Sequence, residues 1–342
     1  MKLNKEKKKM ENTGTSLLQV KKLSKTFVLG KSVFRQALGN KPEHLRAVYE
    51  VDMDIKAGEC LGLVGESGCG KTTLGRCILR LHEPEKGEVL FEGKNFLEMK
   101  GQDLVKMRSK MQVIFQDPYS SLNPRHKIGY IVGEPNLVHK ICTRAELDER
   151  VKYLLNTVGL GPEIAERFPH SLSGGQRQRV GLARALAVNP KFIVADEPVS
   201  ALDVSIQAQV INLLMELREK YHLTMLFITH DLRLVQHVSD RIAVMYLGSI
   251  VELSPSTDLF NAPLHPYSQA LLAAAPIVNP RKRSKAVAIT GEPPNPINIP
   301  PGCPFRPRCQ LSFDRCEIEF PKLEEKRPNH YVACFAVHSE LN

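Results

Sequence analysis

The chain has 342 residues, of which 42% are hydrophobic, and a formal net charge of +10 at pH 7. This is an ordinary composition for a soluble protein with one large or two smaller domains. No run approaches the roughly 18 apolar residues that a membrane-spanning helix needs, and the lysine-rich start lacks the apolar region of a secretory signal. We therefore expect a cytoplasmic chain, whose eight cysteines do not form a disulfide framework.

The N-terminal residues, 1–16, are expected to form a disordered basic tail. Positive charge is concentrated there, between Lys2 and Lys9, and again in the cluster Arg281–Arg283. We interpret both as solvated segments, with contact to an anionic membrane surface as the alternative. The charge is not striped along one predicted helix, which disfavours nucleic acid as a partner.

Residues 17–262 alternate short apolar strand patterns with helical patterns, which predicts an α/β domain. From Pro263 onward the sequence becomes irregular and rich in proline. Since proline disfavours helix, we expect residues 263–342 to form a small, loop-rich extension. Such a segment needs an additional link, for example a bound metal, to stabilise its fold.

A glycine-rich motif of the pattern GxxxxGK[ST] follows the strand-like run from Cys60 to Val64. In such a loop the glycines let backbone N–H groups wrap phosphates, Lys71 reaches the terminal phosphates, and the Thr72 hydroxyl ligates Mg²⁺. Apolar residues at helical spacing come next, so the pattern predicts a strand, a phosphate-binding loop and a helix. The loop consists of Gly65, Glu66, Ser67, Gly68, Cys69, Gly70, Lys71, Thr72 and Thr73.

Polar residues also follow three other strand-like runs. Gln116 follows the first run, the pair Asp196 and Glu197 ends the second, and His230 follows the third. Because open α/β sheets bind ligands at the carboxyl ends of their strands, we expect these side chains to face one ligand. Asp196 can hold magnesium through water, and Glu197 can polarise an attacking water. Taken singly, acid pairs also cap helices, and a lone histidine is more often structural.

The sequence LSGGQ, Leu172–Gln176, marks an expected helix start. The Ser173 hydroxyl and the N–H groups of Gly174 and Gly175 would make an anion site there, with the positive end of the helix dipole behind it. The later segment Ser200–Asp203 also has the pattern of a helix start, with Ser200 as the cap.

The order of these motifs resembles that of the nucleotide-binding domain of ABC ATPases. The resemblance covers roughly residues 17–262 and implies a P-loop NTPase fold, with a RecA-like core and an antiparallel β subdomain. It also implies a helical subdomain at about 117–185, the part expected to meet a membrane subunit. The motifs that carry it are the phosphate-binding loop, Gln116, LSGGQ, Asp196–Glu197, Ser200–Asp203 and His230.

The resemblance assigns a role to each motif. It implies that two subunits close around two MgATP, each nucleotide lying between one chain's phosphate-binding loop and the other chain's LSGGQ, and that hydrolysis reopens them. Glu197 would be the catalytic base, His230 would contact the γ-phosphate, and Asp203 would join the two sites across the interface. MgATP would be held by Lys71, Thr72, Gln116 and Asp196, and the partner's nucleotide by Ser173, Gly174, Gly175 and Gln176.

Members of this family also stack adenine on an aromatic residue upstream of the loop. Phe27 matches that position, although a buried core phenylalanine is an equal alternative. An insertion of basic and small residues, at about 31–46, lies between Phe27 and the loop, so Phe34 and Tyr49 are also candidates.

The tail resembles the C-terminal extension of oligopeptide and dipeptide importer ATPases. The matching runs are PLHPY, Pro263–Tyr267, and CPFRPRC, Cys303–Cys309. The loop GESGCGKTT and the region 161–179 most resemble the second of the two ATPase subunits. The resemblance implies a peripheral subunit on the cytoplasmic face of the inner membrane that energises peptide uptake; nickel and other small-solute importers share the extension and are the alternative.

The implied partners are a paralogous ATPase subunit or a second copy of this chain, two integral-membrane permease subunits and, indirectly, an extracytoplasmic solute-binding protein. An ABC ATPase acting on DNA or the ribosome is the rival class. Such proteins usually carry a long coiled-coil or zinc insertion or two ATPase domains, and this sequence has an importer-type tail instead. A nucleotide sensor without turnover is disfavoured because Glu197 and His230 are both present.

Four late cysteines need a separate explanation. They are separated by five, six and seventeen residues, which fits neither a zinc ribbon nor the close ferredoxin run. Soft thiolates in a poorly cored lobe favour zinc or an iron–sulfur cluster over unliganded thiols. The resemblance to importer ATPases implies a [4Fe–4S] cluster on Cys303, Cys309, Cys316 and Cys334. The scattered cysteines, Cys60, Cys69, Cys77 and Cys142, are interpreted as structural.

Overall fold

The computed structural model describes residues 16–29, 43–117, 121–274, 294–297, 299 and 301–340. The tail expected at residues 1–16 therefore lies outside the described residues except for Ser16, which begins the first strand. Phe34 and the basic cluster Arg281–Arg283 also lie outside them.

The centre of the molecule is an eight-stranded sheet in the order β11-β12-β10-β9-β3-β8-β7-β6. The pairs β6–β7, β7–β8, β8–β3 and β3–β9 are parallel. The pairs β9–β10, β10–β12 and β12–β11 are antiparallel. Every residue of β3, β7 and β8 is buried, as expected of parallel strands covered on both faces. The parallel part comprises β3 (Cys60–Val64), β6 (Met111–Ile114), β7 (Phe192–Asp196), β8 (Thr224–Ile228) and β9 (Arg241–Tyr246).

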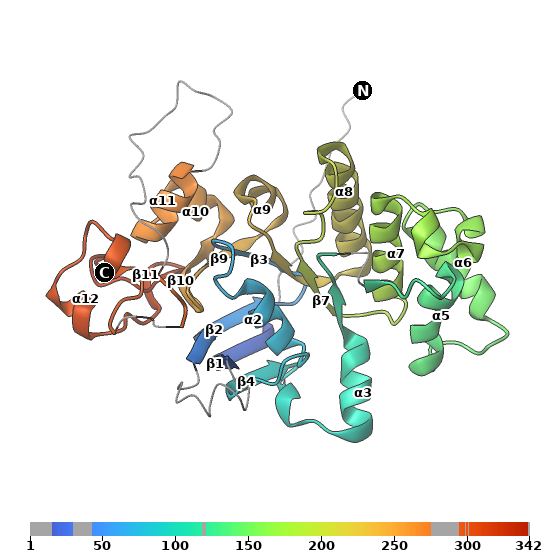
Figure 1. Cartoon of the computed structure of the whole chain (residues 1–342), viewed down its shortest axis with the longest axis horizontal. Coiled ribbons are helices and arrows are strands. Elements are labelled where there is room, and N and C mark those ends of the chain that lie inside the picture. Colours follow the sequence, from blue (N-terminus) through green and yellow to red (C-terminus); the bar gives the residue numbers. More distant parts are fainter. Residues whose placement is uncertain are drawn as a thin grey trace, which may run out of the picture.

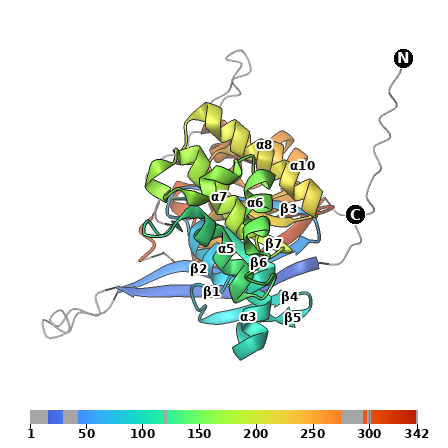
Figure 2. The same ribbon diagram turned by 90° about the vertical axis from the view of Figure 1, so that its right-hand side faces the viewer.

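A second, antiparallel sheet has the order β2-β1-β4-β5. Figures 1 and 2 show it below the central sheet, with α3 beside it. The Phe91 and Phe192 rings, 6.5 Å apart, connect the cores of the two sheets. Its elements are β1 (Ser16–Leu29), β2 (Glu43–Lys56), β4 (Lys86–Phe91) and β5 (Lys94–Asn95), followed by the short 3-10 helix η1 (Phe96–Glu98) and α3 (Gly101–Lys110).

Helices gather at the edge of the central sheet that β6 forms. Figure 1 shows α5, α6 and α7 there, while α8 and α9 lie above the central sheet in that view. Buried apolar residues of these helices share one core with β7 and β8. The helices are α5 (Ile128–Val138), α6 (Leu147–Thr157), η2 (Pro162–Glu166), η3 (Pro169–Ser171), α7 (Gly174–Leu186), α8 (Val204–Tyr221) and α9 (Leu232–Val238).

The C-terminal extension lies at the opposite side of the molecule from α5 and α6 (Figure 1). It contributes two strands to the central sheet, because β12 pairs with β10. The sequence-based expectation of an irregular extension missed these strands, which are only three and four residues long. The elements just before the extension are β10 (Ser249–Pro255) and α10 (Ser256–Asn261). The extension itself contains α11 (Pro266–Ala274), η5 (Arg306–Arg308), α12 (Asp314–Ile318), β11 (Glu324–Arg327) and β12 (His330–Val332).

A buried polar cluster holds the extension on the sheet. Glu252 of β10 is fully buried and accepts hydrogen bonds from the N–H groups of Leu264 and His265, at 2.8 and 3.0 Å. Its Oε1 atom lies 2.7 Å from Nε2 of the buried His330 on β12. Burial would raise the pKa of Glu252, but the hydrogen bonds from His330, Leu264 and their neighbours lower it below its ordinary value. Glu252 is thus a charged anchor for two segments of the extension.

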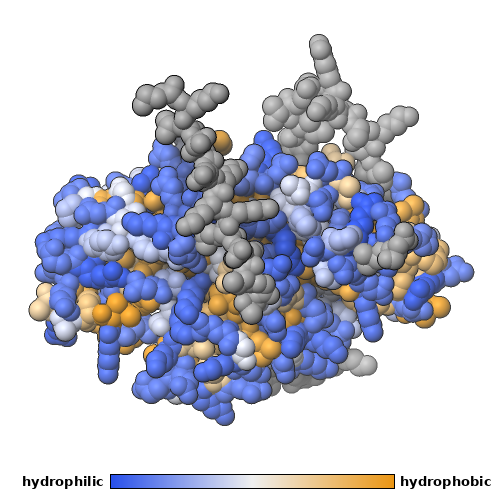
Figure 3. All heavy atoms as spheres, turned by 180° about the vertical axis from the view of Figure 1, so that it is seen from behind, coloured by the Kyte–Doolittle hydropathy of each residue, from blue (hydrophilic) through white to orange (hydrophobic). Residues whose placement is uncertain are grey.

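The surface is mainly hydrophilic, with apolar groups near both lateral ends of the view in Figure 3. Exposed large apolar side chains occur around α5 and α6 and in the C-terminal extension. They are Tyr130, Val138, Ile141 and Tyr153 at the first place, and Leu311, Phe313 and Ile318 at the second.

Candidate functional site

The phosphate-binding loop connects buried β3 to α2 (Lys71–Ile78), as the motif predicts. Gly65 has φ +154°, and a Cβ atom there would lie 2.2 Å from the carbonyl oxygen of Met245. Gly70 has φ +108°, and its Cβ would lie 2.1 Å from the carbonyl oxygen of Ala47. The loop is thus wedged between β2 and β9, and only glycine fits at both places.

Lys71 points into its own loop. Its side chain is buried, and the ammonium group donates hydrogen bonds to the carbonyl oxygens of Gly65 and Glu66, each at 2.9 Å. The cation therefore lies inside the curve of backbone that the motif assigns to phosphate. This location fits the role of a lysine that meets phosphate oxygens.

The loop and the end of β7 meet through one hydrogen bond. Thr72 Oγ1 donates to Asp196 Oδ1 at 2.9 Å, so two residues that the sequence separates widely share one place. Burial raises the pKa of Asp196, against the lowering effect of this hydrogen bond. A hydroxyl and a carboxylate oxygen are the hard ligands that Mg²⁺ prefers.

Glu197 is the centre of a second cluster, built from the ends of three strands. Gln116 Nε2 donates to Glu197 Oε2 at 2.7 Å, and His230 Nδ1 lies 3.1 Å from Glu197 Oε1. The three residues follow β6, β7 and β8, which are neighbours in the sheet. The structure therefore brings together the three strand-end residues that the sequence singles out.

The backbone at Glu197 is in the left-handed region, with φ +45°. Its N–H donates to the carbonyl oxygen of Ile228 at 2.9 Å, which ties this turn to β8. A non-glycine residue in that region costs of order 1 kcal/mol or more and persists only where its surroundings fix it. The turn directs the Glu197 carboxylate to Gln116 and His230 rather than along the strand.

The LSGGQ segment forms the start of α7, as predicted. Ser173 is the N-cap, and with Gln176 it makes a reciprocal capping box: the Gln176 N–H donates to Ser173 Oγ at 3.3 Å, and the Ser173 N–H donates to Gln176 Oε1 at 3.0 Å. A Cβ atom at Gly175 would lie 2.6 Å from Ile206 of α8, so glycine permits close packing of the two helices. Figure 1 shows α7 apart from α2, on the other side of β7.

The prediction of Ser200 as a helix cap is wrong. Helix α8 begins at Val204, and Asp203 is its N-cap residue, whose carbonyl oxygen accepts the N–H groups of Ile206 and Gln207. Ser200 instead donates its hydroxyl to the Glu197 carbonyl oxygen at 3.2 Å. Turns closed by the N–H groups of Ser200 and Leu202, on the carbonyl oxygens of Glu197 and Val199, precede the helix, so it begins three residues later than a cap at Ser200 would allow. Asp203 is exposed at the surface.

Phe27 and Tyr49 have different surroundings. Phe27 lies on β1 with its ring 5.5 Å from that of His82, edge to face, and is partly exposed. The Tyr49 ring is enclosed by the Arg46 guanidinium, 4.0 Å from its centroid, and the Phe320 ring, at 5.1 Å. Lys25 Nζ lies 5.3 Å from the Phe27 ring centroid, so both aromatic candidates are half-buried and each has a cationic neighbour.

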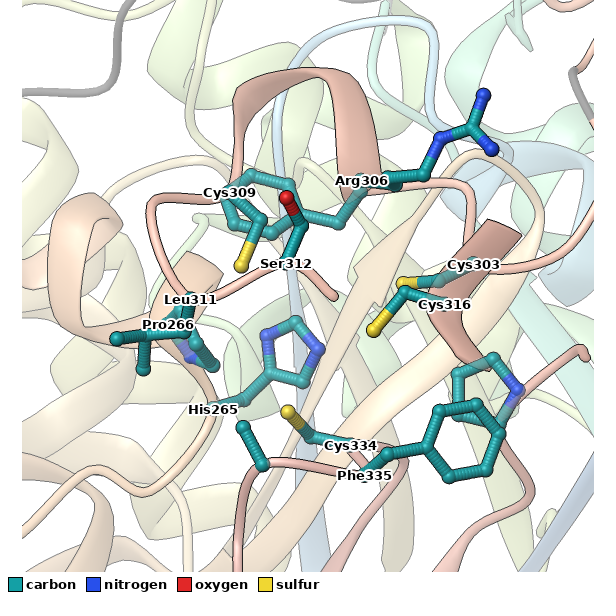
Figure 4. A pocket seen from close by; sticks show the side chains of 13 residues that line it. His265, Pro266, Cys303, Arg306, Cys309, Leu311, Ser312, Cys316, Cys334 and Phe335 are labelled. Carbon is teal, nitrogen blue, oxygen red and sulfur yellow. The ribbon is translucent and has the colours of Figure 1, made fainter. Parts of the chain in front are cut away.

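The four late cysteines line one pocket, together with His265 and Phe335 (Figure 4). Their sulfur atoms point toward a shared space, although no group of three or more His, Cys, Asp or Glu side chains among the described residues is arranged to hold a metal ion. Burial raises the pKa of Cys303 to about 11, and it also raises the pKa of Cys309 and Cys334. Cys60, Cys69 and Cys77 are buried in the core, and Cys142 is half-buried.

Sequence reasoning missed two residues of the extension that touch the phosphate-binding loop. Arg308 forms an ion pair with Glu66, and Tyr267 accepts the N–H of Glu66 at 2.9 Å. Both residues lie in the runs PLHPY and CPFRPRC that resemble the extension of importer ATPases, but neither run predicts a contact with the phosphate-binding loop.

Two family models match the chain. The model described as "ABC transporter" matches residues 48–200, and the model described as "Oligopeptide/dipeptide transporter, C-terminal region" matches residues 251–316. The first match contains the phosphate-binding loop, LSGGQ and the Asp196–Glu197 pair, and the second contains three of the four late cysteines.

Curated relatives match the chain over nearly its whole length. The oligopeptide transport ATP-binding protein AppF of Bacillus subtilis is 47% identical over 93% of this chain and 97% of its own. The dipeptide transport ATP-binding protein DppF of Haemophilus influenzae is 44% identical over 94% of this chain and 97% of its own.

Solved structures share the fold of the ATPase part. The dimeric ATP-binding cassette MJ0796 in a post-hydrolysis state, bound to ADP and Pi, has a TM-score of 0.61 and 29% identity, covering 70% of this chain and 98% of that chain. CbiO1 of Clostridium perfringens has a TM-score of 0.60 and 26% identity, covering 72% and 91%. The P-loop NTPase fold is thereby confirmed, and the chain belongs to the ABC transporter ATP-binding proteins of the oligopeptide/dipeptide type.

Proposed function

We propose that this chain hydrolyses ATP as the energising subunit of an ABC importer of peptides. The observation that carries the proposal is the contact of Glu197 with Gln116 and His230, next to the Thr72–Asp196 pair. A sensor that only bound nucleotide would need no such carboxylate cluster at the strand ends. The relatives named above are described as oligopeptide and dipeptide transport proteins, which supports peptides over nickel or another small solute.

The chemistry follows from the position of each side chain. Lys71 would bind the terminal phosphates, and the oxygens of Thr72, Gln116 and Asp196 would hold Mg²⁺. When bound, the ion would supply positive charge that neutralises the phosphates during hydrolysis. Glu197 would orient the attacking water and accept its proton, in hydrogen bond contact with Gln116.

His230 is more exposed than Glu197, with 62% of its side chain accessible against 15%. This exposure suits a residue that contacts the γ-phosphate of an incoming nucleotide. Because its Nδ1 atom is close to Glu197, the histidine can also fix the orientation of the carboxylate.

The nucleotide site would be completed by a partner chain. LSGGQ and Asp203 lie on α7 and at the start of α8, away from α2 of the same chain (Figure 1). The capping box leaves the α7 N-terminus well formed, and such a terminus binds anions through its N–H groups and dipole. We therefore assign Ser173, Gly174, Gly175 and Gln176 to the nucleotide of a paralogous ATPase subunit or of a second copy of this chain.

The helical subdomain would carry the contact with two permease subunits. Tyr130 and Val138 on α5 are 51% and 61% exposed, and Ile141 follows at 38%. No helix in the part of the chain that the structure describes is long and apolar enough to cross a membrane. These apolar side chains give a peripheral subunit a surface for its membrane partners at the cytoplasmic face of the membrane.

We also propose that the four late cysteines hold a [4Fe–4S] cluster. They surround one pocket, and burial raises the pKa of Cys303 to about 11 and also raises the pKa of Cys309 and Cys334, so binding to a soft metal centre would stabilise their thiolates. Small movements of the loops are needed, since the described cysteines do not yet match a metal geometry.

Anaerobic purification followed by iron, sulfide and zinc analysis tests the cluster. We expect about four irons per chain, a brown absorbance, and loss of both in Cys303→Ser but not in the matched Cys142→Ser. Zinc in place of iron would replace the cluster with a structural zinc site. Protein without either metal would show that the cysteines are thiols of a packed lobe.

Reconstitution with the partner ATPase and permeases tests the function itself. We expect ATP hydrolysis that rises when a peptide-loaded binding protein is added, together with peptide accumulation in the vesicles. Hydrolysis stimulated by nickel or another small solute, with no response to peptides, would favour the alternative importer.

A further inference from the structure

The C-terminal extension reaches the phosphate-binding loop through a forked ion pair. Arg308 Nη1 lies 2.9 Å from Glu66 Oε2, and Arg308 Nη2 lies 3.0 Å from Glu66 Oε1. The two residues are 242 positions apart in the chain. Only 6% of the Arg308 side chain and 24% of the Glu66 side chain are exposed. This is a bidentate arrangement, which fixes the direction of a carboxylate more strictly than a single contact does.

The same loop residue is also held by its backbone. The Glu66 N–H donates to the hydroxyl of Tyr267, which is fully buried on α11. Tyr267 packs with Tyr246 and Phe305, with ring centroids 4.6 and 5.6 Å away. Since Phe305 precedes η5, the extension's Tyr267, Phe305 and Arg308 form one support, which packs on Tyr246 of β9.

Glu66 links this support to Lys71 of the phosphate-binding loop. Its carbonyl oxygen accepts a hydrogen bond from the Lys71 ammonium at 2.9 Å, while its side chain and N–H are taken by the extension. A change in the position of Glu66 therefore moves the backbone that surrounds Lys71.

An ion pair at this place indicates that Arg308 orients Glu66 and does more than attach the extension to the loop. Apolar residues would attach the extension at least as well, because desolvation offsets much of the gain from a buried charge pair. What a guanidinium adds is a fixed planar geometry. Arg308 also approaches Tyr246 of β9, at 3.4 Å from its hydroxyl, so the guanidinium is itself held in place.

We infer that Arg308 and Tyr267 are positioning residues of the phosphate-binding loop, through which the cysteine-bearing extension sets the affinity of this chain for ATP. Arg308 lies between Cys303 and Cys309, so the conformation of the cysteine loops and that of the phosphate-binding loop are linked. By reciprocity, nucleotide in the loop would stabilise the same arrangement of the extension. The inference rests on the proposed function only in so far as the loop binds ATP.

The test measures the binding of a fluorescent ATP analogue to the full chain, and the ATPase parameters with the partner subunit. We expect Arg308→Ala to raise the dissociation constant and KM about tenfold, with kcat within about threefold, since Gln116, Glu197 and His230 do not touch Arg308. Arg308→Lys cannot form the bidentate contact, so its dissociation constant should lie between those of the parent chain and Arg308→Ala.

Arg306→Ala is the matched control, because Arg306 belongs to the same short helix but pairs with Glu317, 3.7 Å away. It should leave the dissociation constant unchanged. Thermal unfolding of each variant shows whether the extension still folds. If Arg306→Ala weakened ATP binding as much as Arg308→Ala, the effect would be general damage to the extension and the inference would be wrong.

A double-mutant cycle separates the pair from its surroundings. Arg308→Ala combined with Glu66→Gln should bind ATP no more weakly than the worse single variant, because both remove the same contact. Fully additive effects, or an Arg308→Ala variant within twofold of the parent, would overturn the inference and leave the proposed function intact. An unmodified chain that bound no ATP would overturn the proposed function and this inference together.

Discussion

The nucleotide site and the C-terminal extension both bring distant residues together, but different parts of the polypeptide hold them. At the nucleotide site, Gln116, Glu197 and His230 follow neighbouring strands of one parallel sheet, so backbone hydrogen bonds determine where they meet. Around the extension, single buried side chains make the decisive contacts: Glu252 of β10 holds the extension on the sheet, and Arg308 of the extension holds the phosphate-binding loop. Changes at the first region should therefore alter chemistry with little effect on folding. At the second region, loss of Glu252 should alter stability, and loss of Arg308 should alter the affinity for ATP.

The largest effect is expected from Glu197→Gln. Loss of the carboxylate removes the general base, so the ATPase rate should fall by about 10²–10⁴-fold, while ATP still binds and traps the closed dimer. The measurement is the ATPase rate with the partner subunit, beside gel filtration with ATP. Asp231→Asn, which keeps a helix cap on α9, is the nearby control. Hydrolysis at the parental rate would rule out Glu197 as the base.

Glu252→Ala tests the other side of the comparison. It leaves His330 and two N–H groups buried without their partner, so the free energy of unfolding should fall by roughly 3–5 kcal/mol. Glu324→Ala is the control and should cost little, because the Glu324 side chain in its pair with Lys326 is 63% exposed. Because the folded pKa of Glu252 lies below its ordinary value, its contribution is present above about pH 4.5 and is lost as pH falls through the folded pKa. Denaturant unfolding at pH 7 and pH 4 measures both effects. An unchanged midpoint would show that the anchor is unimportant.

Phe27→Ala should weaken ATP binding by about tenfold if this ring stacks on adenine. Tyr49→Ala should not, because Tyr49 is already enclosed by Arg46 and Phe320. Equilibrium binding of ATP and of inorganic triphosphate distinguishes the two, since only the nucleotide has a base to stack. The reverse pattern would move the adenine site to Tyr49.

The smallest effect is expected from Ser173→Ala in the isolated chain, where loss of the N-cap should cost about 1 kcal/mol of stability. Ser173→Asn keeps a capping side chain and should restore that stability. If the serine hydroxyl also contacts the partner's nucleotide, both variants should hydrolyse ATP slowly in the assembled pair. Full activity of Ser173→Asn would limit Ser173 to its role as a cap.

Much of the nucleotide site could be predicted because its signals are local. The strand, loop and helix around Lys71 are encoded in about twenty consecutive residues, and the α7 start is encoded by its own capping box. The clustering of Gln116, Glu197 and His230 could be anticipated from their places after strands, since a parallel sheet brings such ends together. A shared site for the four cysteines was implied by the resemblance to importer ATPases, because their spacing carried no information about their geometry.

By itself, the sequence determined the strand, loop and helix around Lys71 and the place where α7 begins, because those features depend on neighbours a few residues away. Only the tertiary structure decided the left-handed turn at Glu197, the late start of α8 and the addition of β11 and β12 to the central sheet. It also decided that Arg308 meets Glu66 across 242 positions. No local pattern specifies such contacts, since they arise only when packing brings two separate surfaces together and burial makes an unpaired charge too costly.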